Sequence, residues 1–168
     1  MNHKEIVIRK MIEGDWDDVR EIFIEGIQTG NATFQTEAPT WEEWDASHTV
    51  KCRFVATFKE KVVGWAALSP ISSRKAFSGV AEVSIYLYGS STGMGIGGKL
   101  LKHLIEDSEQ QGFWTIQSMI FPENEGSIHL HRKHSFEIVG TRKKIGKLNG
   151  VWRDVVLLER RSFLTGKD

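Results

Sequence analysis

The chain has 168 residues, of which 40% are hydrophobic and 26% charged, and this composition is typical of folded globular proteins rather than disordered ones. Lysines and arginines number 22, as do aspartates and glutamates, so no net charge draws the chain to nucleic acid or to an anionic membrane. The single cysteine, Cys52, excludes an internal disulfide framework and a cysteine zinc site, and we expect it to be a buried apolar residue. With no membrane-length apolar run and no secretory leader, the expected location is cytoplasmic.

The N-terminal part of the chain is predicted to form one strand and two helices. Ile6–Arg9 is a short apolar strand. Asp15 is placed to cap a helix with apolar residues at helical spacing, and Gly30-Asn31 ends that helix. Residues 31–39 are irregular. Thr40, with a glutamate three residues later, predicts a capping box at the start of a short second helix.

The middle of the chain is predicted to form three strands. Arg53–Phe58 and Val62–Leu68 are apolar runs joined by three charged residues, which indicates a hairpin, and Ser69-Pro70 ends the second run. A loop over residues 71–79 leads to a strand over residues 80–88. Side chains of this strand alternate between an apolar face and a polar or aromatic face. The apolar face carries Ala81, Val83, Ile85 and Leu87, and the other face carries Glu82, Ser84, Tyr86 and Tyr88.

The C-terminal part begins with a helix that has an apolar stripe from Ile96 to Ile105 and ends at Gly112. A strand over residues 114–120 and a short helix from Asn124 follow. Asn149-Gly150, between two alternating runs, predicts a final hairpin. The order β-α-α-β-β-β-α-β-α-β-β predicts a single α/β domain with a mixed sheet, spanning residues 1–168 with its core over about 6–160.

A glycine-rich stretch, Thr92-Gly93-Met94-Gly95-Ile96-Gly97-Gly98, separates the strand over residues 80–88 from the helix that follows it. Glycine is conformationally costly, so such a cluster indicates a sharp turn or a close approach of backbone to a ligand. The start of a helix also presents unpaired N–H groups and the positive end of the helix dipole. The stretch therefore predicts an anion site, most often one for phosphate.

Three kinds of phosphate loop fit the spacing of these glycines. Gly93-x-Gly95-x-x-Gly98 satisfies the dinucleotide fingerprint, but that fold needs further βαβ units, and only one strand–helix pair and a hairpin follow here. A nucleoside-triphosphate loop needs Ser or Thr after Lys99 to hold Mg²⁺, and Leu100 stands there. An acyl-CoA pyrophosphate site is the alternative that suits a short domain.

The element order and this loop resemble the GCN5-related N-acetyltransferase (GNAT) superfamily, whose loop reads Gln/Arg-x-x-Gly-x-Gly/Ala. The chain keeps the two diagnostic glycines, Gly95 and Gly97, and has Thr92 at the leading position, where the backbone N–H can still serve. From about Ile8 to Glu159 the chain is similar to the phosphinothricin (methionine sulfoximine) acetyltransferase branch. The similarity is carried by Thr29–Phe34, Val80–Tyr86, Ile120–Glu125 and Asn149–Val156. One departure is Ser135, where the branch has a glycine that ends the short helix.

The resemblance implies a mixed, mostly antiparallel sheet flanked by helices, acetyl-CoA as the acetyl donor, no metal, and a homodimer. It also places acetyl-CoA against the end of the strand over residues 80–88 and the glycine-rich loop. The coenzyme contacts that it implies are Ile85, Tyr86, Leu87, Thr92, Gly93, Met94, Gly95, Ile96, Gly97, Gly98, Asn124 and Ser127.

Acetyl transfer to an amine needs a base, because an ammonium ion has no lone pair. Glu82 is the candidate base, acting through a water; without the resemblance it is equally well an exposed carboxylate or a partner of Arg74. His131 occupies the position where many members of the superfamily carry a tyrosine that protonates the departing thiolate, and histidine titrates near neutrality. Its alternative role is that of a structural hydrogen-bonding residue.

The implied acceptor is a small-molecule amine, an amino acid or an analogue of one. Arg74 matches the substrate arginine of the family and suits a carboxylate; as an ordinary loop residue it would be solvated. Phe34 and Thr36 lie on the segment expected to cover the acceptor, and Phe77 is a candidate wall residue. Two alternatives stay open: transfer to another amine, such as a polyamine or a protein N-terminus, and a non-catalytic acyl-CoA-binding module.

Overall fold

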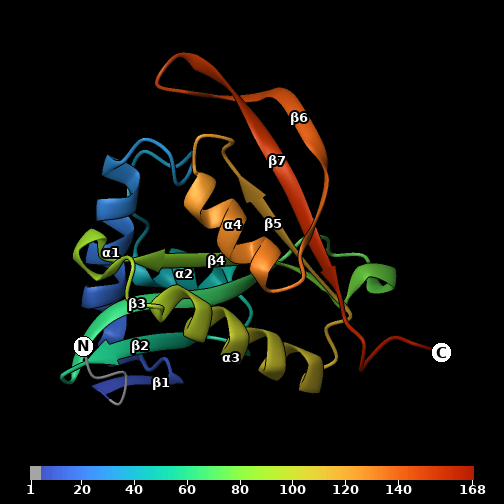
Figure 1. Cartoon of the computed structure of the whole chain (residues 1–168), viewed down its shortest axis with the longest axis horizontal. Coiled ribbons are helices and arrows are strands. Elements are labelled where there is room, and N and C mark those ends of the chain that lie inside the picture. The colour runs from blue at the N-terminus through green and yellow to red at the C-terminus, as the bar shows by residue number, and fades with distance from the viewer. Residues whose placement is uncertain (1–4) are drawn as a thin grey trace.

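The computed structural model describes residues 5–168, and its seven strands form one sheet in the order β1-β2-β3-β4-β5-β7-β6 (Figure 1). Neighbouring strands are antiparallel except β4 and β5, which are parallel. The predicted mixed, mostly antiparallel sheet is therefore confirmed. The strands are β1 (Ile6–Lys10), β2 (Phe54–Phe58), β3 (Lys61–Pro70), β4 (Val80–Leu87), β5 (Thr115–Ile120), β6 (Glu137–Leu148) and β7 (Val151–Arg161).

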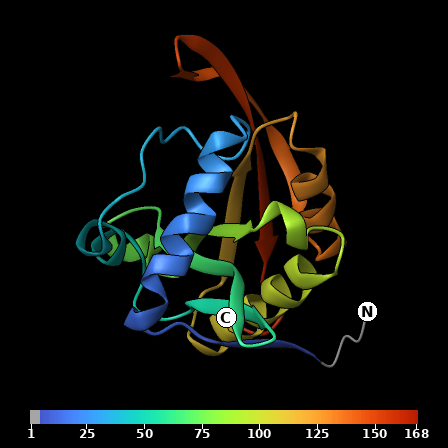
Figure 2. The ribbon, with the colours of Figure 1, turned by 90° about the vertical axis from the view of Figure 1, so that its left-hand side faces the viewer.

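Helices cover both faces of the sheet, with α1 and α2 on one side and α3 and α4 on the other (Figure 2). The helices are α1 (Trp16–Gln28), α2 (Trp41–Ser47), α3 (Ile96–Gln110) and α4 (Glu125–Lys133). Their order along the chain is the predicted one. Within residues 5–168, no helix combines the length and the apolar composition that crossing a membrane requires.

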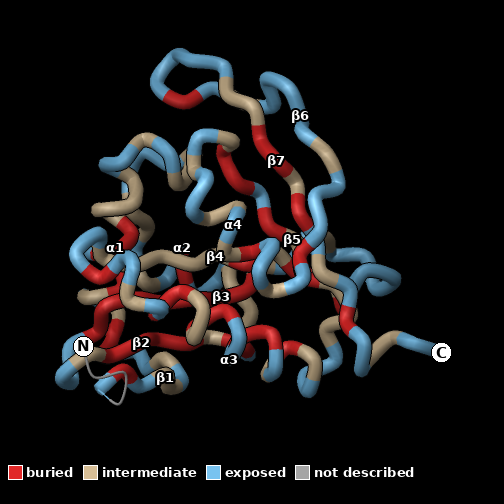
Figure 3. The backbone as a smooth tube through the Cα atoms, viewed as in Figure 1, coloured by how far each residue is buried: buried red, intermediate tan, exposed pale blue. Residues whose placement is uncertain are grey.

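β2 and β3 are buried along most of their length, as the red tube in Figure 3 shows, whereas β4 has only Ala81 and Val83 buried. On one side, α3 packs its apolar stripe against a large cluster that includes Ala81 and Val83 of β4. On the other side, α1 and α2 pack against a second cluster around Trp44 and Trp65. Cys52 belongs to the first cluster, as expected, and burial raises the pKa of its thiol to about 12.

The start of α1 differs from the prediction in one respect. Asp15 stands at the position before the helix, but its side chain does not cap it. The carboxylate instead accepts two hydrogen bonds from the Arg9 guanidinium, each 2.8 Å long, and one of 2.9 Å from the backbone N–H of Ile12. Burial raises the pKa of Asp15, but these bonds outweigh burial and hold the pKa below its usual value. Asp15 thus ties β1 to α1.

Three element boundaries follow their sequence signals: the start of α2, the turn of the final hairpin and the end of β3. At the start of α2, Glu43 N–H donates to Thr40 Oγ1 at 3.2 Å and Thr40 N–H donates to Glu43 Oε2 at 3.0 Å, which confirms the capping box. The final hairpin turns at Asn149-Gly150, both with positive φ. β3 ends at Pro70, at the predicted Ser69-Pro70 break, although the ladder to β4 includes both residues and Pro70 pairs with Ala81.

The turn after α4 forms without the glycine that the resembling branch has there. Ser135 adopts a φ of 69°, in the left-handed region. The N–H groups of Ser135 and Phe136 donate to the carbonyls of Arg132 and His131, each at 3.1 Å. A side chain in this region costs about 1 kcal/mol relative to glycine, so the turn is retained at the expense of some stability.

We therefore expect Ser135→Gly to raise the free energy of unfolding by about 1 kcal/mol, since it removes this conformational cost. Chemical denaturation of the purified chain measures the change. Ser135→Ala is the control, because it keeps the left-handed φ and loses only the hydroxyl. Equal stability of the glycine and alanine variants would show that the left-handed φ carries no cost.

Candidate active site

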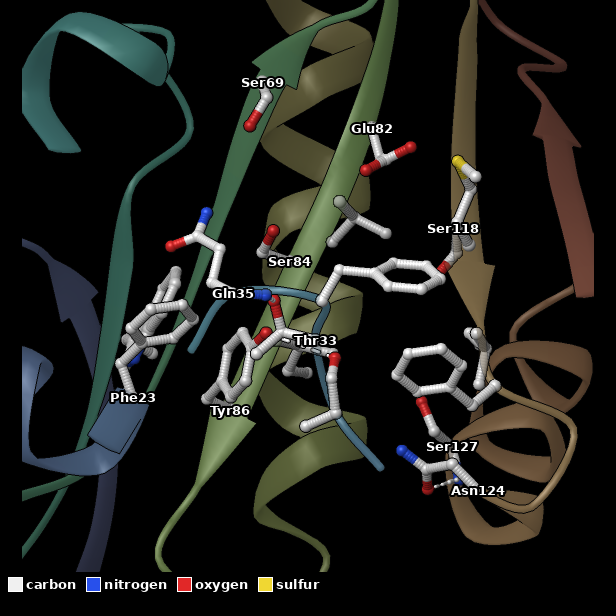
Figure 4. A pocket seen from close by; sticks show the side chains of 18 of the residues that line it. Phe23, Thr33, Gln35, Ser69, Glu82, Ser84, Tyr86, Ser118, Asn124 and Ser127 are labelled. Atoms are coloured by element: carbon white, nitrogen blue, oxygen red, sulfur yellow. Dashed lines mark hydrogen bonds between the residues drawn. The ribbon is translucent and has the colours of Figure 1, made fainter. Parts of the chain in front are cut away.

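β4 and β5 pair over three residues only and then diverge, which opens the middle of the sheet. Their ladder joins Val80–Glu82 to Thr115–Gln117. Beyond it, β4 continues to Leu87 along β3 and β5 continues to Ile120 along β7, so the two strands separate (Figure 1). A cavity of about 690 Å³ lies at this opening. Figure 4 shows the cavity from close by.

The diverging edge of β4 presents backbone amides to the opening. In the antiparallel ladder, Tyr88 N–H donates to the carbonyl of Val63 at 3.0 Å, in register with the β3–β4 pairs. Because amides alternate between the two edges of a strand, those of Val83, Ile85 and Leu87 face away from β3, toward β5. Beyond Glu82 no strand pairs with this edge among residues 5–168. These amides are therefore available to a bound molecule.

Glu82 lies at the closed end of the opening, on the last pair of the β4–β5 ladder. Its side chain projects from the same face of β4 as those of Ser84 and Tyr86 (Figure 4), as the sequence alternation predicted. Gln117 of β5 donates from Nε2 to Glu82 Oε1 at 3.0 Å. This bond fixes the carboxylate and leaves its other oxygen for a proton or a water. Gln117 was not singled out by the sequence, since nothing local links it to Glu82.

Tyr86 is a packing residue on this face rather than a proton donor. Its ring stacks on Trp65 with centroids 5.0 Å apart, and burial raises the pKa of its hydroxyl to about 12. The hydroxyl donates to the carbonyl of Ala32 at 3.4 Å. Tyr86 therefore forms the wall of the cavity beside Ser84.

His131 also lines the cavity, from α4, and the residue is 1% exposed. Nδ1 lies 2.7 Å from the carbonyl oxygen of Ser127, so this nitrogen carries the proton and donates it. Burial lowers the pKa of His131 more than this hydrogen bond raises it, so the ring is neutral near pH 7. Nε2 is buried and has no partner among the described residues.

The glycine-rich loop adopts backbone that requires glycine. Gly93 and Gly95 have φ values of 79° and 75°, and Gly95 is the residue before α3. A Cβ on Gly97 would lie 3.1 Å from Leu130, so this glycine lets α3 approach α4. The first turn of α3 has the free amides and the dipole that suit a pyrophosphate. The loop thus fits the coenzyme that the sequence predicted.

The residues next to these glycines, Thr92, Met94 and Ile96, offer fewer groups to the coenzyme than the sequence predicted. The N–H of Thr92 donates to the carbonyl of Gly89 at 3.3 Å, and its Oγ1 donates to the same carbonyl at 2.8 Å. The Thr92 amide is therefore used within its own turn, contrary to our expectation that it remains available. Ile96 is 1% exposed and the partly buried Met94 packs against the core, so their side chains contribute to packing rather than to a binding surface.

Asn124 and Ser127 sit together at the start of α4 and line the cavity. Asn124 accepts a hydrogen bond of 3.3 Å from the N–H of Ser127, drawn in Figure 4, and so caps the helix. Its Nδ2 donates to the carbonyl of Asn31 at 3.4 Å. The structure thus brings both predicted residues to the same end of the cavity as His131.

The residues predicted to bind the acceptor are only partly brought together. Phe34 lines the cavity and packs edge-on against Phe121, with ring centroids 4.9 Å apart. Thr36, Arg74 and Phe77 are exposed and are not part of its lining. In the part of the chain that the structure describes, the lining contains no lysine or arginine. It does contain residues that the sequence did not point to as site residues, namely Phe23, Asn31, Trp44, His48, Trp65 and Ser69.

No group of three or more His, Cys, Asp or Glu residues within residues 5–168 is arranged to hold a metal ion. The acidic groups in the cavity lining are Glu43 and Glu82, and Glu43 is engaged in the capping box of α2. Glu82 is therefore the carboxylate of this cavity that is placed to accept a proton.

Comparison with known proteins agrees with this geometry. The chain is 30% identical over 159 residues to phosphinothricin N-acetyltransferase of Streptomyces viridochromogenes, covering 92% of this chain and 87% of that protein. It is 33% identical over 99 residues to the L-methionine sulfoximine/L-methionine sulfone acetyltransferase of Pseudomonas aeruginosa, covering 59% and 58% of the two chains.

A solved structure of a phosphinothricin acetyltransferase from Sinorhizobium meliloti, in complex with acetyl-CoA, superposes with a TM-score of 0.88. It is 28% identical, and the match covers 98% of this chain and 92% of that one. The acetyltransferase (GNAT) family model matches residues 16–136, most of the domain described above. This chain belongs to the acetyltransferase (GNAT) family and is an acetyl-CoA-dependent N-acetyltransferase.

Proposed function

We propose that this protein transfers the acetyl group of acetyl-CoA to the amino group of a small amino acid or amino-acid analogue. One observation carries the proposal: Glu82 stands at the closed end of the opening between β4 and β5, and the glycine-rich loop follows the open end. Relatives similar in sequence are named for phosphinothricin and for methionine sulfoximine or sulfone.

In this proposal, Glu82 accepts a proton from the acceptor ammonium, directly or through a water, and so frees the lone pair that attacks the thioester carbon. Gln117 holds the carboxylate in place at 3.0 Å. The outward amides of Val83 and Ile85 are the donors available to polarise the thioester oxygen. The amides of Gly93, Gly95 and the first turn of α3 hold the pyrophosphate of the donor.

His131 is the candidate for returning a proton to the sulfur of CoA. Its ring is neutral at rest and Nε2 carries no proton, so it must take one before it can give one. After it attacks the thioester carbon, the acceptor nitrogen has to lose a second proton as the amide forms. His131 Nε2 takes this proton and passes it to the sulfur of CoA. His131 therefore acts first as an acceptor and then as a donor, and no covalent enzyme intermediate is needed.

This role predicts the pH dependence of the wild-type protein. Because burial lowers the pKa of His131 below its ordinary value, Nε2 becomes mostly protonated only at a more acidic pH than in an exposed histidine. We expect kcat/KM to fall in that acidic range and not to fall between pH 7 and 8. A decline through pH 7 to 8 that disappears in His131→Gln would instead show a resting imidazolium that acts as the acid.

The acceptor carboxylate needs a cation, and the described cavity lining supplies none. We propose Arg74, because its loop over residues 71–79 directly follows β3, whose Ser69 lines the cavity and pairs with Glu82. Phe34 would pack against the acceptor side chain. Thr36 and Phe77 stay predictions, since both are exposed outside the cavity.

An acetyl-transfer screen tests the proposal. The purified full chain is incubated with acetyl-CoA and single acceptors, and released CoA thiol is measured. Free amino acids, phosphinothricin and methionine sulfoximine represent the proposed class; polyamines and a peptide with a free N-terminus represent the alternatives. We expect steady thiol release with at least one amino acid or analogue. Turnover with polyamine or peptide alone would contradict the proposed class, and binding of acetyl-CoA without turnover would support a non-catalytic module.

We also propose a cytoplasmic homodimer. Six of the large apolar residues that are more than a third exposed lie on β5, β6 and β7, and a second copy of the chain would cover those that share a face. The six are Met119, Ile138, Val139, Ile145, Val151 and Trp152. Sedimentation equilibrium should give twice the chain mass, and Trp152→Glu should shift it toward the monomer. Fractionation of cells that express the tagged chain tests the location.

A further inference from the structure

The segment after α1 forms one wall of the cavity without any strand or helix of its own. Residues 31–35, which we call the strap, all line the cavity. Figure 4 shows this blue segment crossing β4 and entering the space between β4 and β5, with Thr33 and Gln35 on it. Because no backbone ladder holds the strap, its position depends on side-chain bonds from other parts of the fold.

Arg153 of β7 makes the strongest of these bonds. Its guanidinium donates to the carbonyl of Gly30 at 2.8 Å and to Asn31 Oδ1 at 2.8 Å. It also pairs with Glu123 at 3.2 Å and lies over the ring of Phe121 at 4.0 Å. The Arg153 side chain is only 14% exposed. One cation thus joins β7, the end of β5 and the start of the strap.

The remaining contacts of the strap are weaker. Asn124 donates to the carbonyl of Asn31 and Tyr86 donates to the carbonyl of Ala32, both at 3.4 Å. Phe34 packs on Phe121, whose ring also lies 4.0 Å from the Arg153 guanidinium. Arg153 is the one charged group among these contacts, and charge-assisted hydrogen bonds are about twice as strong as neutral ones.

We propose that Arg153 is a positioning residue for the acceptor: it fixes the strap across the opening between β4 and β5, and so sets the acceptor wall formed by residues 31–35. The inference rests on the proposed function, since it assigns that cavity to the acceptor. It implies that the terminal hairpin controls acceptor binding through the strap and leaves the coenzyme loop at residues 92–98 untouched.

Arg153→Met tests this role, with Arg153→Lys as the conservative variant. Arg160→Met is the matched control: Arg160 lies on the same strand, its side chain is also 14% exposed, and it pairs with Glu109 at 2.7 Å, away from the strap. Both methionine variants remove a largely buried guanidinium from an ion pair, so both lose stability, and Arg160→Met loses the more buried partner. They differ in whether the strap loses its anchor.

We expect Arg153→Met to raise the acceptor KM about tenfold while the acetyl-CoA KM stays within twofold of the wild type. Hydrogen exchange of residues 29–36 should quicken about tenfold in the same variant. Arg153→Lys should recover part of both effects, and Arg160→Met should show neither. An unchanged acceptor KM in Arg153→Met, or equal effects in Arg160→Met, would overturn the proposal.

The exchange measurement separates this inference from the proposed function. If the wild-type chain acetylates no amine, the proposed function fails, whereas faster exchange in Arg153→Met alone still supports the anchoring of the strap. If the wild type turns over and neither exchange nor acceptor KM responds to Arg153→Met, the anchoring role is wrong and the proposed function stands.

Discussion

Glu82→Gln is expected to lower kcat by about 100-fold to 10,000-fold, the range that a positioned general base contributes. The amide cannot take a proton from the acceptor ammonium at neutral pH. It keeps the size of the carboxylate, and its oxygen can still accept the 3.0 Å hydrogen bond from Gln117. Folding and acetyl-CoA binding should therefore be preserved, so the loss should fall on kcat rather than on the coenzyme KM.

Glu159→Gln is the matched control for this variant. Glu159 on β7 is the ladder partner of Gln117 on β5, and it is not part of the cavity lining. The Glu159→Gln variant therefore removes a negative charge from the same row of the sheet and leaves the cavity unchanged. We expect its kcat to stay within twofold of the wild type. Steady-state rates between pH 6.5 and 8.5 measure both variants. A Glu82→Gln protein with more than a third of wild-type kcat across this range would remove Glu82 from the mechanism.

Most elements of the fold are predictable because their signals are local. The alternation along β4 indicates which side chains face α3, and the capping box at Thr40 marks the start of α2. Asp15 shows the limit of such signals. The sequence places it before α1, but cannot show that Arg9, on the preceding strand, takes its carboxylate. Pro70 shows a second limit: the predicted strand stops at Leu68, but the ladder to β4 continues through Ser69 and Pro70.

The candidate site is predictable only where one element carries it. Glu82 and the glycine-rich loop follow from a single strand and a single turn. Gln117 and Arg153 do not, because each acts on a segment at least 30 residues away, and only the fold brings the partners together. Arg74 illustrates the reverse case: the sequence offers a guanidinium for the acceptor, and the structure leaves it exposed outside the cavity lining.

A negative charge placed at the anion site at the start of α3 is expected to weaken acetyl-CoA binding strongly. Gly95 has a φ of 75°, and a Cβ built on it meets no atom within 4 Å, so a side chain has room but must accept left-handed backbone. Asn and Asp accept that region better than other side chains do. Gly95→Asn and Gly95→Asp therefore share nearly the same shape and backbone cost and differ by one negative charge.

We expect the acetyl-CoA KM of Gly95→Asp to exceed that of Gly95→Asn by about tenfold to 100-fold at low salt. Two unit charges 4 Å apart repel by about 1 kcal/mol in water and about 4 kcal/mol near a protein surface, and the pyrophosphate carries more than one charge. The difference should shrink as salt rises, because the site is exposed.

The expected change in folding stability between the two Gly95 variants is opposite in direction to the expected change in acetyl-CoA binding, so the two effects can be told apart. An aspartate before the first turn of α3 interacts favourably with the helix dipole, so Gly95→Asp should unfold at or above the temperature of Gly95→Asn. Weaker coenzyme binding in the more stable variant cannot come from unfolding. It must come from repulsion between the carboxylate and an anion at the helix start. Equal KM values for the two variants at low salt would place the pyrophosphate elsewhere.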